Sequence, residues 1–319
     1  MSNLTEVGIL RRGGKKHLCS GPLGNIILCD TKKGRDSPGV RPLWRLLRVD
    51  VRPIGVFDSG LGGLTAVREL RRLLPQEDII YFGDTGRVPY GTRSRETIIK
   101  YARQDVAFLR TFDLKAIVIA CGTVSTTALD LLQEENSIPI LGVVEPAARA
   151  AAGLTRNGLI GLIGTQASIR SGAYERIIHR ENPSARVLSM ACPLFVPLVE
   201  NGRFHPGDVV IETVAAEYLS SLRGAGVDTL VMGCTHYPLL EEVIGAYMGR
   251  QVRLVNAGTE GARAAKEALE ARDALAQRGG EGSLRCFVSD SVEDFAHLAS
   301  LFLGWDMRDR VTQVDIGQY

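Results

Sequence analysis

From Pro53 onward, short apolar runs alternate with longer amphipathic stretches, and this alternation constrains the fold more than any other feature of the chain. The runs IGVF, AIVIAC, LIGLIGT and TLVMGC have the length and composition of buried strands. The stretches between them, such as LTAVRELRRLLP, repeat apolar residues at helical spacing. Because strands that alternate with helices form mainly parallel sheets covered by helices, we predict an α/β protein.

The part of the chain that follows residue 52 consists of two similar halves. One half opens on IGV at Ile54 and the other on IGL at Ile160, and each later reaches an apolar run that ends in a small residue, Cys and Thr: IVIACGT and LVMGCT. We therefore predict two similarly built α/β lobes. The first covers residues 53–149 and is completed by 260–319, and the second covers 150–259.

Residues 1–52 differ from the rest in composition. They carry 11 Lys and Arg against 4 Asp and Glu, are rich in Gly and Pro, and lack sustained periodicity, which favours a flexible basic extension. No aromatic interleaving supports nucleic-acid binding. No run approaches the roughly 18 apolar residues of a membrane span, and no signal-peptide pattern opens the chain. We expect a cytoplasmic protein that binds neither nucleic acid nor membrane.

Two of the six cysteines, Cys121 and Cys234, follow predicted strands directly. The spacings of the six fit neither a zinc site nor a disulfide scaffold, so we expect free thiols and no metal. In α/β sheets, ligands bind beyond the carboxyl ends of strands, where helix N-termini lower the pKa of a thiol. Either thiol alone would be read as a core residue. Two thiols in matching places favour a chemical role.

Other polar residues follow predicted strands in the same way. Asp58 and Ser59 lie in a glycine-rich strand-to-helix turn, where a carboxylate and a hydroxyl could hold a substrate ammonium group. His236 follows Cys234 by two residues and could move a proton or stabilise a thiolate. Glu145 also follows an apolar run, although acids near helix N-termini are common for dipole reasons alone. Another turn, after the apolar run DIIYFG, contains Pro89, Tyr90 and Gly91, which could line a pocket.

Together, the motifs FDSGLGGLT, DTGRVPYGTRS, ACGT, ACPLFVPLVENG and GCTHYPLL resemble those of the aspartate/glutamate racemase family, from about Pro53 to Gly304. The resemblance implies two domains facing each other across a cleft and a homodimer. It also implies cofactor-independent racemisation of glutamate, which supplies D-glutamate for peptidoglycan synthesis.

The resemblance also implies roles for individual residues. Catalysis would fall to Cys121, which serves the D-enantiomer, and Cys234, which serves the L-enantiomer, assisted by Asp58 and His236. Substrate would contact Asp58, Ser59, Pro89, Tyr90, Gly91, Gly122, Thr123, Thr235, His236 and a nearby carboxylate, Glu145. The chain departs from the family at Gly122, where Asn is usual, and at Asn256, a position we interpret as structural. The first departure suggests that Gly122→Asn would lower KM.

Three alternatives remain open at this point. The substrate could be a related amino acid such as aspartate, which lacks one methylene of glutamate. A cysteine hydrolase or amidotransferase would use one thiol with His236, but it leaves the second thiol unexplained and lacks a G-x-C-x-G elbow. A non-catalytic amino-acid-binding module would keep the cleft without turnover, and Gly122 keeps this alternative open.

Overall fold

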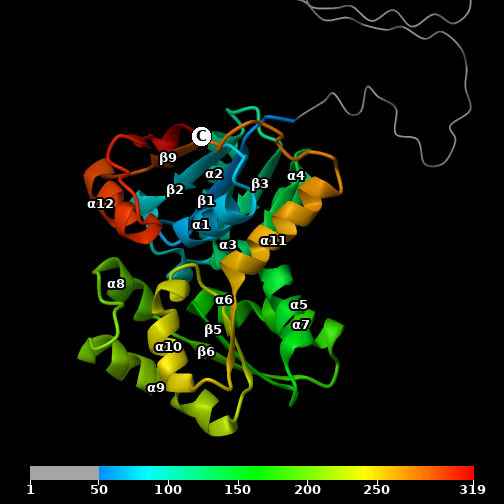
Figure 1. Ribbon diagram of the computed structural model, residues 1–319, viewed down its shortest axis with the longest axis vertical. Helices are drawn as coiled ribbons and strands as arrows, with labels where there is room; N and C mark the ends of the chain where they lie inside the picture. The colour runs from blue at the N-terminus through cyan, green and yellow to red at the C-terminus, as the bar shows by residue number, and fades with distance from the viewer. Residues whose placement is uncertain (1–49) are drawn as a thin grey trace, which may run out of the picture. The chain divides into compact units, whose positions relative to one another are not determined.

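The computed structural model describes residues 50–319, and the basic extension expected over residues 1–52 lies almost entirely outside the described residues (Figure 1). The described chain forms two sheets in which every strand pair is parallel. Helices cover both sheets (Figure 1). The predicted α/β class with two parallel sheets is therefore confirmed.

The first sheet has six strands in the order β10-β9-β2-β1-β3-β4. Its central strands are fully buried, which explains their uninterrupted apolar sequences. The strands are β1 (Ile54–Asp58), β2 (Ile79–Gly83), β3 (Ala116–Ile119), β4 (Ile140–Gly142), β9 (Leu284–Val288) and β10 (Val311–Gln313). The helices that alternate with them are α1 (Leu64–Leu73), α2 (Arg95–Leu109), α3 (Gly122–Thr127), α4 (Leu129–Glu135) and α12 (Val292–Leu303).

The second sheet has four strands in the order β6-β5-β7-β8. They are β5 (Leu159–Gly164), β6 (Arg186–Ala191), β7 (Thr229–Met232) and β8 (Arg253–Asn256). Its helices are α6 (Gln166–Ser171), α7 (Ala173–Glu181), α8 (Phe195–Glu200), α9 (Val209–Ala225) and α10 (Glu241–Met248). The short 3-10 segments are η2 (Thr85–Arg87), η3 (Tyr90–Thr92), η4 (Tyr237–Leu240) and η5 (Ile316–Gln318).

Two helices stand where the chain passes between the sheets: α5 (Val144–Leu154), after β4, and α11 (Ala257–Glu270), after β8 (Figure 1). Asn256 begins α11 by accepting hydrogen bonds from the backbone N–H groups of Gly258 and Thr259 at 2.9 and 3.2 Å. The structural role predicted for position 256 is confirmed, because an N-cap side chain satisfies helix donors that have no partner within the helix.

No helix of the described chain, residues 50–319, has the length and apolar character needed to cross a membrane.

Candidate active site between the two sheets

A pocket of about 210 Å³ lies where loops beyond the carboxyl ends of both sheets meet. Loops that follow β1, β2 and β3 form one wall, and loops that follow β5, β6 and β7 form the other. This is the edge at which parallel α/β sheets bind ligands. The lining residues are Ser59, Val88, Pro89, Tyr90, Gly91, Thr92, Cys121, Gly122, Thr123, Thr165, Gln166, Cys192, Pro193, Val196, Pro197, Glu200, Cys234, Thr235 and His236.

Cys121 and Cys234 both line this pocket, one from each sheet. Cys121 is the residue before α3, two positions after β3, and Cys234 follows β7 by two positions. Each of these strands pairs with the first strand of its own half, β3 with β1 and β7 with β5. The matching sequence contexts IVIACGT and LVMGCT therefore occupy matching places in the two sheets.

The surroundings of Cys121 favour its protonated form. Its Sγ lies 3.5 Å from Oγ of Ser59, and the side chain is almost completely buried. Burial, together with the nearby charge of Asp58, raises the pKa of the Cys121 thiol to about 12. At neutral pH this residue is therefore a thiol, which is the state of a proton donor.

Cys234 instead has an imidazole beside it. Its Sγ lies 3.8 Å from Nδ1 of His236, whose Nε2 lies 3.0 Å from Oε1 of Glu200. Burial opposes a charge on His236, but its hydrogen bonds with Cys234 and Glu200 outweigh burial and raise the pKa of the imidazole to about 10. At neutral pH His236 is thus a cation whose ring places a positive charge next to the Sγ of Cys234.

Hydroxyl groups connect the two walls of the pocket. Thr123 and Thr165 bring their Oγ1 atoms within 3.0 Å of each other from loops of different sheets. Thr165 also begins α6, because its Oγ1 accepts the N–H of Ser168 at 3.2 Å. Ser59 and Thr235 add further hydroxyl groups to the lining. Such groups can donate to a carboxylate or accept from an ammonium group.

Glycines let the backbones of the two walls approach closely. A Cβ at Gly122 would lie well inside 3.0 Å of the carbonyl oxygen of Gly233, in the loop of the other sheet. A Cβ at Gly91 would meet the side chain of Thr165 at 2.8 Å. The structure therefore contradicts the suggestion that Gly122→Asn would simply restore a substrate contact, because the added side chain has no space without a backbone shift.

Two of the predicted site residues are not part of the pocket lining, although Oδ1 of Asp58 lies 3.4 Å from Oγ1 of the lining residue Thr235. Asp58 is completely buried outside the pocket lining, where its Oδ2 accepts the N–H groups of Gly60 and Gly63 at 3.2 and 3.0 Å and thereby holds the turn that carries Ser59. Glu145 is half exposed on α5 and pairs with Arg149 and Arg180, both at 2.9 Å. Its position after an apolar run reflects a helix first turn and a surface ion-pair cluster, which corrects its assignment to the site.

Conversely, Glu200, Thr165, Gln166 and Cys192 line the pocket although they were not among the predicted site residues. Glu200 is the last residue of α8 and the only acid in ACPLFVPLVENG, so its place at the end of that motif was the available signal. Thr165 follows the run LIGLIG, just as Cys121 and Asp84 follow theirs. Cys192 directly follows the run RVLSMA, which forms β6, and this place after an apolar run was the available signal.

Comparison with known proteins identifies the class of protein to which the chain belongs. The family model described as Asp/Glu/Hydantoin racemase matches residues 62–265, a range that includes Cys121 and Cys234.

The relatives are more specific. The chain is 49% identical to the glutamate racemase of Geobacter metallireducens, over 83% of this chain and 97% of that protein. The crystal structure of glutamate racemase isoform RacE1 from Bacillus anthracis superposes with a TM-score of 0.80 at 39% identity, covering 83% of this chain and 98% of that one. The glutamate racemase of Francisella tularensis in complex with D-glutamate gives 0.78 at 39% identity, covering 85% and 100%. The chain belongs to the glutamate racemase family.

Proposed function

We propose that the protein interconverts L-glutamate and D-glutamate by proton transfer between Cys121 and Cys234, without an organic cofactor or a metal. The observation that carries the proposal is the placement of the two thiols, which enter one pocket from matching positions on two separate sheets. A racemase must remove the α-proton from one face and return a proton to the other, and a thiol on each wall meets that requirement.

In the direction from L to D, Cys234 as thiolate takes the α-proton, and the electron pair left on the α-carbon delocalises into the α-carboxylate. Cys121 then delivers its thiol proton to the opposite face and becomes the thiolate. The reverse reaction exchanges the two roles. The electrostatics of the pocket support this assignment, because the raised pKa of Cys121 keeps it protonated and His236 places a cation beside Cys234.

His236, held by Glu200, would assist proton transfer at Cys234. Other residues of the pocket would bind the substrate. Ser59, Thr123 and Thr235 provide hydroxyl groups, and residues 89–91 provide backbone near the pocket. Hydrogen-bond donors placed around the α-carboxylate stabilise the charge that develops there.

The cellular context follows from the family resemblance. We propose that the product D-glutamate serves peptidoglycan synthesis and that the protein works as a cytoplasmic homodimer. Sedimentation of the purified full chain at several concentrations tests the oligomeric state, and a monomer throughout would contradict it.

The decisive assay incubates the enzyme with L-glutamate or L-aspartate in deuterated water. We expect D-glutamate carrying deuterium at the α-carbon, and a reaction with aspartate slowed about fivefold or more, because the missing methylene removes about 1 kcal/mol of burial. Glutamate binding without exchange would instead identify a binding module. Release of ammonia from an amide substrate would identify a hydrolase. Equal turnover of aspartate would contradict the substrate assignment.

A further inference from the structure

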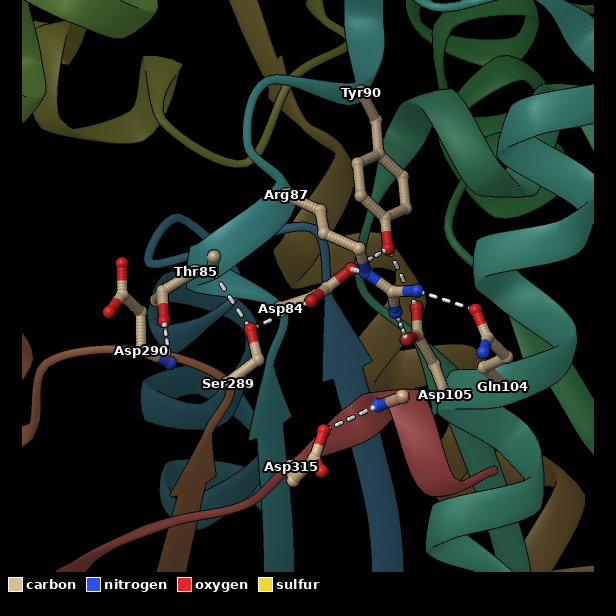
Figure 2. A network of polar contacts seen from close by, with 11 residues as sticks. Asp84, Thr85, Arg87, Tyr90, Gln104, Asp105, Ser289, Asp290 and Asp315 are labelled. Atoms are coloured by element: carbon tan, nitrogen blue, oxygen red, sulfur yellow. Dashed lines mark hydrogen bonds and ion pairs between the residues drawn. The ribbon is translucent and has the colours of Figure 1, made fainter.

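Behind the loop that carries Pro89, Tyr90 and Gly91 lies a buried polar network that the proton-transfer mechanism does not use (Figure 2). Asp84 follows β2, Arg87 ends η2, Tyr90 begins η3 and Asp105 lies on α2. Both carboxyl groups are fully buried, and Tyr90 is 1% exposed. The tyrosine links this network to the pocket, because residues 88–92 line the pocket while the Tyr90 hydroxyl points into the network.

Tyr90 and Arg87 each bridge the two carboxyl groups. The Tyr90 hydroxyl forms a short hydrogen bond with Oδ2 of Asp84 and lies 3.1 Å from Oδ2 of Asp105. Arg87 donates from Nε to Asp84 at 2.5 Å and from Nη2 to Oδ1 of Asp105 at 3.0 Å. Asp84 accepts a third bond at Oδ1, from the Ser289 hydroxyl at 2.7 Å.

Counting protons distinguishes the two acids. A phenol has one proton and an ionised carboxylate has none, so Tyr90 can donate to only one of two carboxylates. Both contacts become hydrogen bonds if one carboxyl group carries a proton and donates it to the tyrosine oxygen. Asp84 already accepts from Arg87, Ser289 and, at the shorter distance, Tyr90, whereas Asp105 has Arg87 and only the longer, 3.1 Å contact with Tyr90. The extra proton therefore belongs on Asp105, which also leaves one carboxylate opposite one guanidinium.

We propose that Asp105 is a positioning residue that holds a proton at neutral pH and, by donating it to Tyr90, fixes the substrate loop of residues 89–91 against the pocket. The proposal rests on the proposed function in assigning substrate to that loop. The groups that act on Asp105 agree with it: burial and the charge of Asp84, with a further contribution from Asp58, raise its pKa well above the ordinary range, and Arg87 and Tyr90 oppose this only in part.

The test compares three variants in the full-length enzyme. In Asp105→Asn, the amide can donate to Tyr90 and accept from Arg87 as the neutral acid does, so we expect KM and kcat within about twofold of the parent. In Asp105→Leu, both bonds are lost, and KM should rise about tenfold with a smaller change in kcat. Asp84→Asn is the matched control, because it replaces an anion that accepts three bonds, and it should raise KM at least as much as Asp105→Leu.

Other results would overturn the proposal. If Asp105→Asn raises KM as much as Asp84→Asn, or fails to fold, Asp105 is ionised in the parent. If Asp105→Leu folds and leaves KM unchanged, the network does not position the loop.

The protonation state can be tested without turnover. With ¹³C-labelled aspartate, the side-chain carboxyl resonance that disappears in Asp105→Asn should lie at the position of a protonated acid at neutral pH. This measurement is independent of racemisation, so a failure of the proposed activity would leave it standing. A resonance at the ionised position would reject the assignment even if the enzyme racemises glutamate.

Discussion

At the residue scale, the two thiols carry the clearest prediction. Cys121→Ser and Cys234→Ser should both fold and both lose racemisation, because a serine hydroxyl is far less acidic than a thiol. Each variant keeps the other of these two thiols, so with glutamate analogues bearing a β-leaving group Cys121→Ser should still eliminate from the L-analogue and Cys234→Ser from the D-analogue. Chiral product analysis measures this mirror-image pattern. Racemisation near the parent rate in either folded variant would refute the mechanism.

Gly122 leads to a prediction opposite to the one drawn from the sequence. Because a Cβ there would press on the carbonyl oxygen of Gly233, Gly122→Ala and Gly122→Asn should raise KM and cost about 1–3 kcal/mol of stability. Gly153 on α5 is the matched control, since no atom lies within 4 Å of its added Cβ, and Gly153→Ala should be neutral or stabilising. Measurements of KM and of thermal unfolding for the three variants test these expectations. A lower KM in Gly122→Asn would contradict this prediction and show that the loop containing Gly233 shifts to admit the side chain.

His236 links stability to pH. Its pKa rises from an ordinary value of 6.5 to about 10 on folding, so above about pH 6.5 the folded state binds more protons than the unfolded chain. The stabilisation is complete below that pH and is lost as the pH rises toward 10. Between about pH 6.5 and 8.5, before free thiols ionise, urea unfolding should show this loss, and His236→Gln should flatten it. An unchanged slope in His236→Gln would contradict the assignment.

The sequence located most of the pocket because a strand end fixes which edge of a sheet a residue occupies. That rule predicted the positions of Cys121, Cys234 and His236, whose roles stay predictions. The rule does not predict the direction of a side chain. It therefore did not show that Oδ2 of Asp58 accepts the N–H groups of Gly60 and Gly63. It also cannot find Glu200, whose contact with His236 depends on the path of α8 in three dimensions.

At the scale of elements, the apolar runs predicted the central strands, but the stretch TTALDLLQEE is not one helix. It divides into α3 and α4 at Ala128, whose φ of −126° is not helical. The apolar runs did not predict β9 or β10. The sequence of β9, LRCFV, alternates buried with more exposed residues, and that of β10, VTQ, is only three residues long. Three residues at the sheet edge, as in β10, are too few for periodicity to reveal a strand.

The N-cap of α11 offers a test of one element. Asn256→Ala removes both hydrogen bonds to the helix N-terminus and should lower stability by about 1 kcal/mol. Asn256→Asp keeps an acceptor and adds a charge that the helix dipole favours, so it should match or exceed the parent. Chemical unfolding of the two variants makes the comparison. Equal losses in both would show that the amide nitrogen, and not the cap, matters.

At the scale of the whole molecule, Lys115 connects three distant parts of the chain. Its ammonium group pairs with Glu77 at 2.5 Å and donates to the carbonyl oxygens of Asp50 and Ala274, both at 2.8 Å, and its side chain is fully buried. Lys115→Met leaves the Glu77 carboxylate buried without its cation and should cost about 3 kcal/mol or more.

Adding Glu77→Gln to Lys115→Met should recover part of that loss, because the amide still accepts the N–H of Ala276 but carries no charge. Urea unfolding of the single and double variants measures the coupling. Strictly additive losses would show that the pair does not interact.

The order of strands has a consequence for biosynthesis. All four strands of the second sheet lie between residues 159 and 256, so a ribosome releases them as one continuous segment. The first sheet begins earlier but ends later, since β2 pairs on one side with β9, residues 284–288. A nascent chain therefore completes its second sheet while the buried strand β2 still has an unpaired edge. That exposed edge is the point at which chaperones, or aggregation between nascent chains, compete with the last step of folding.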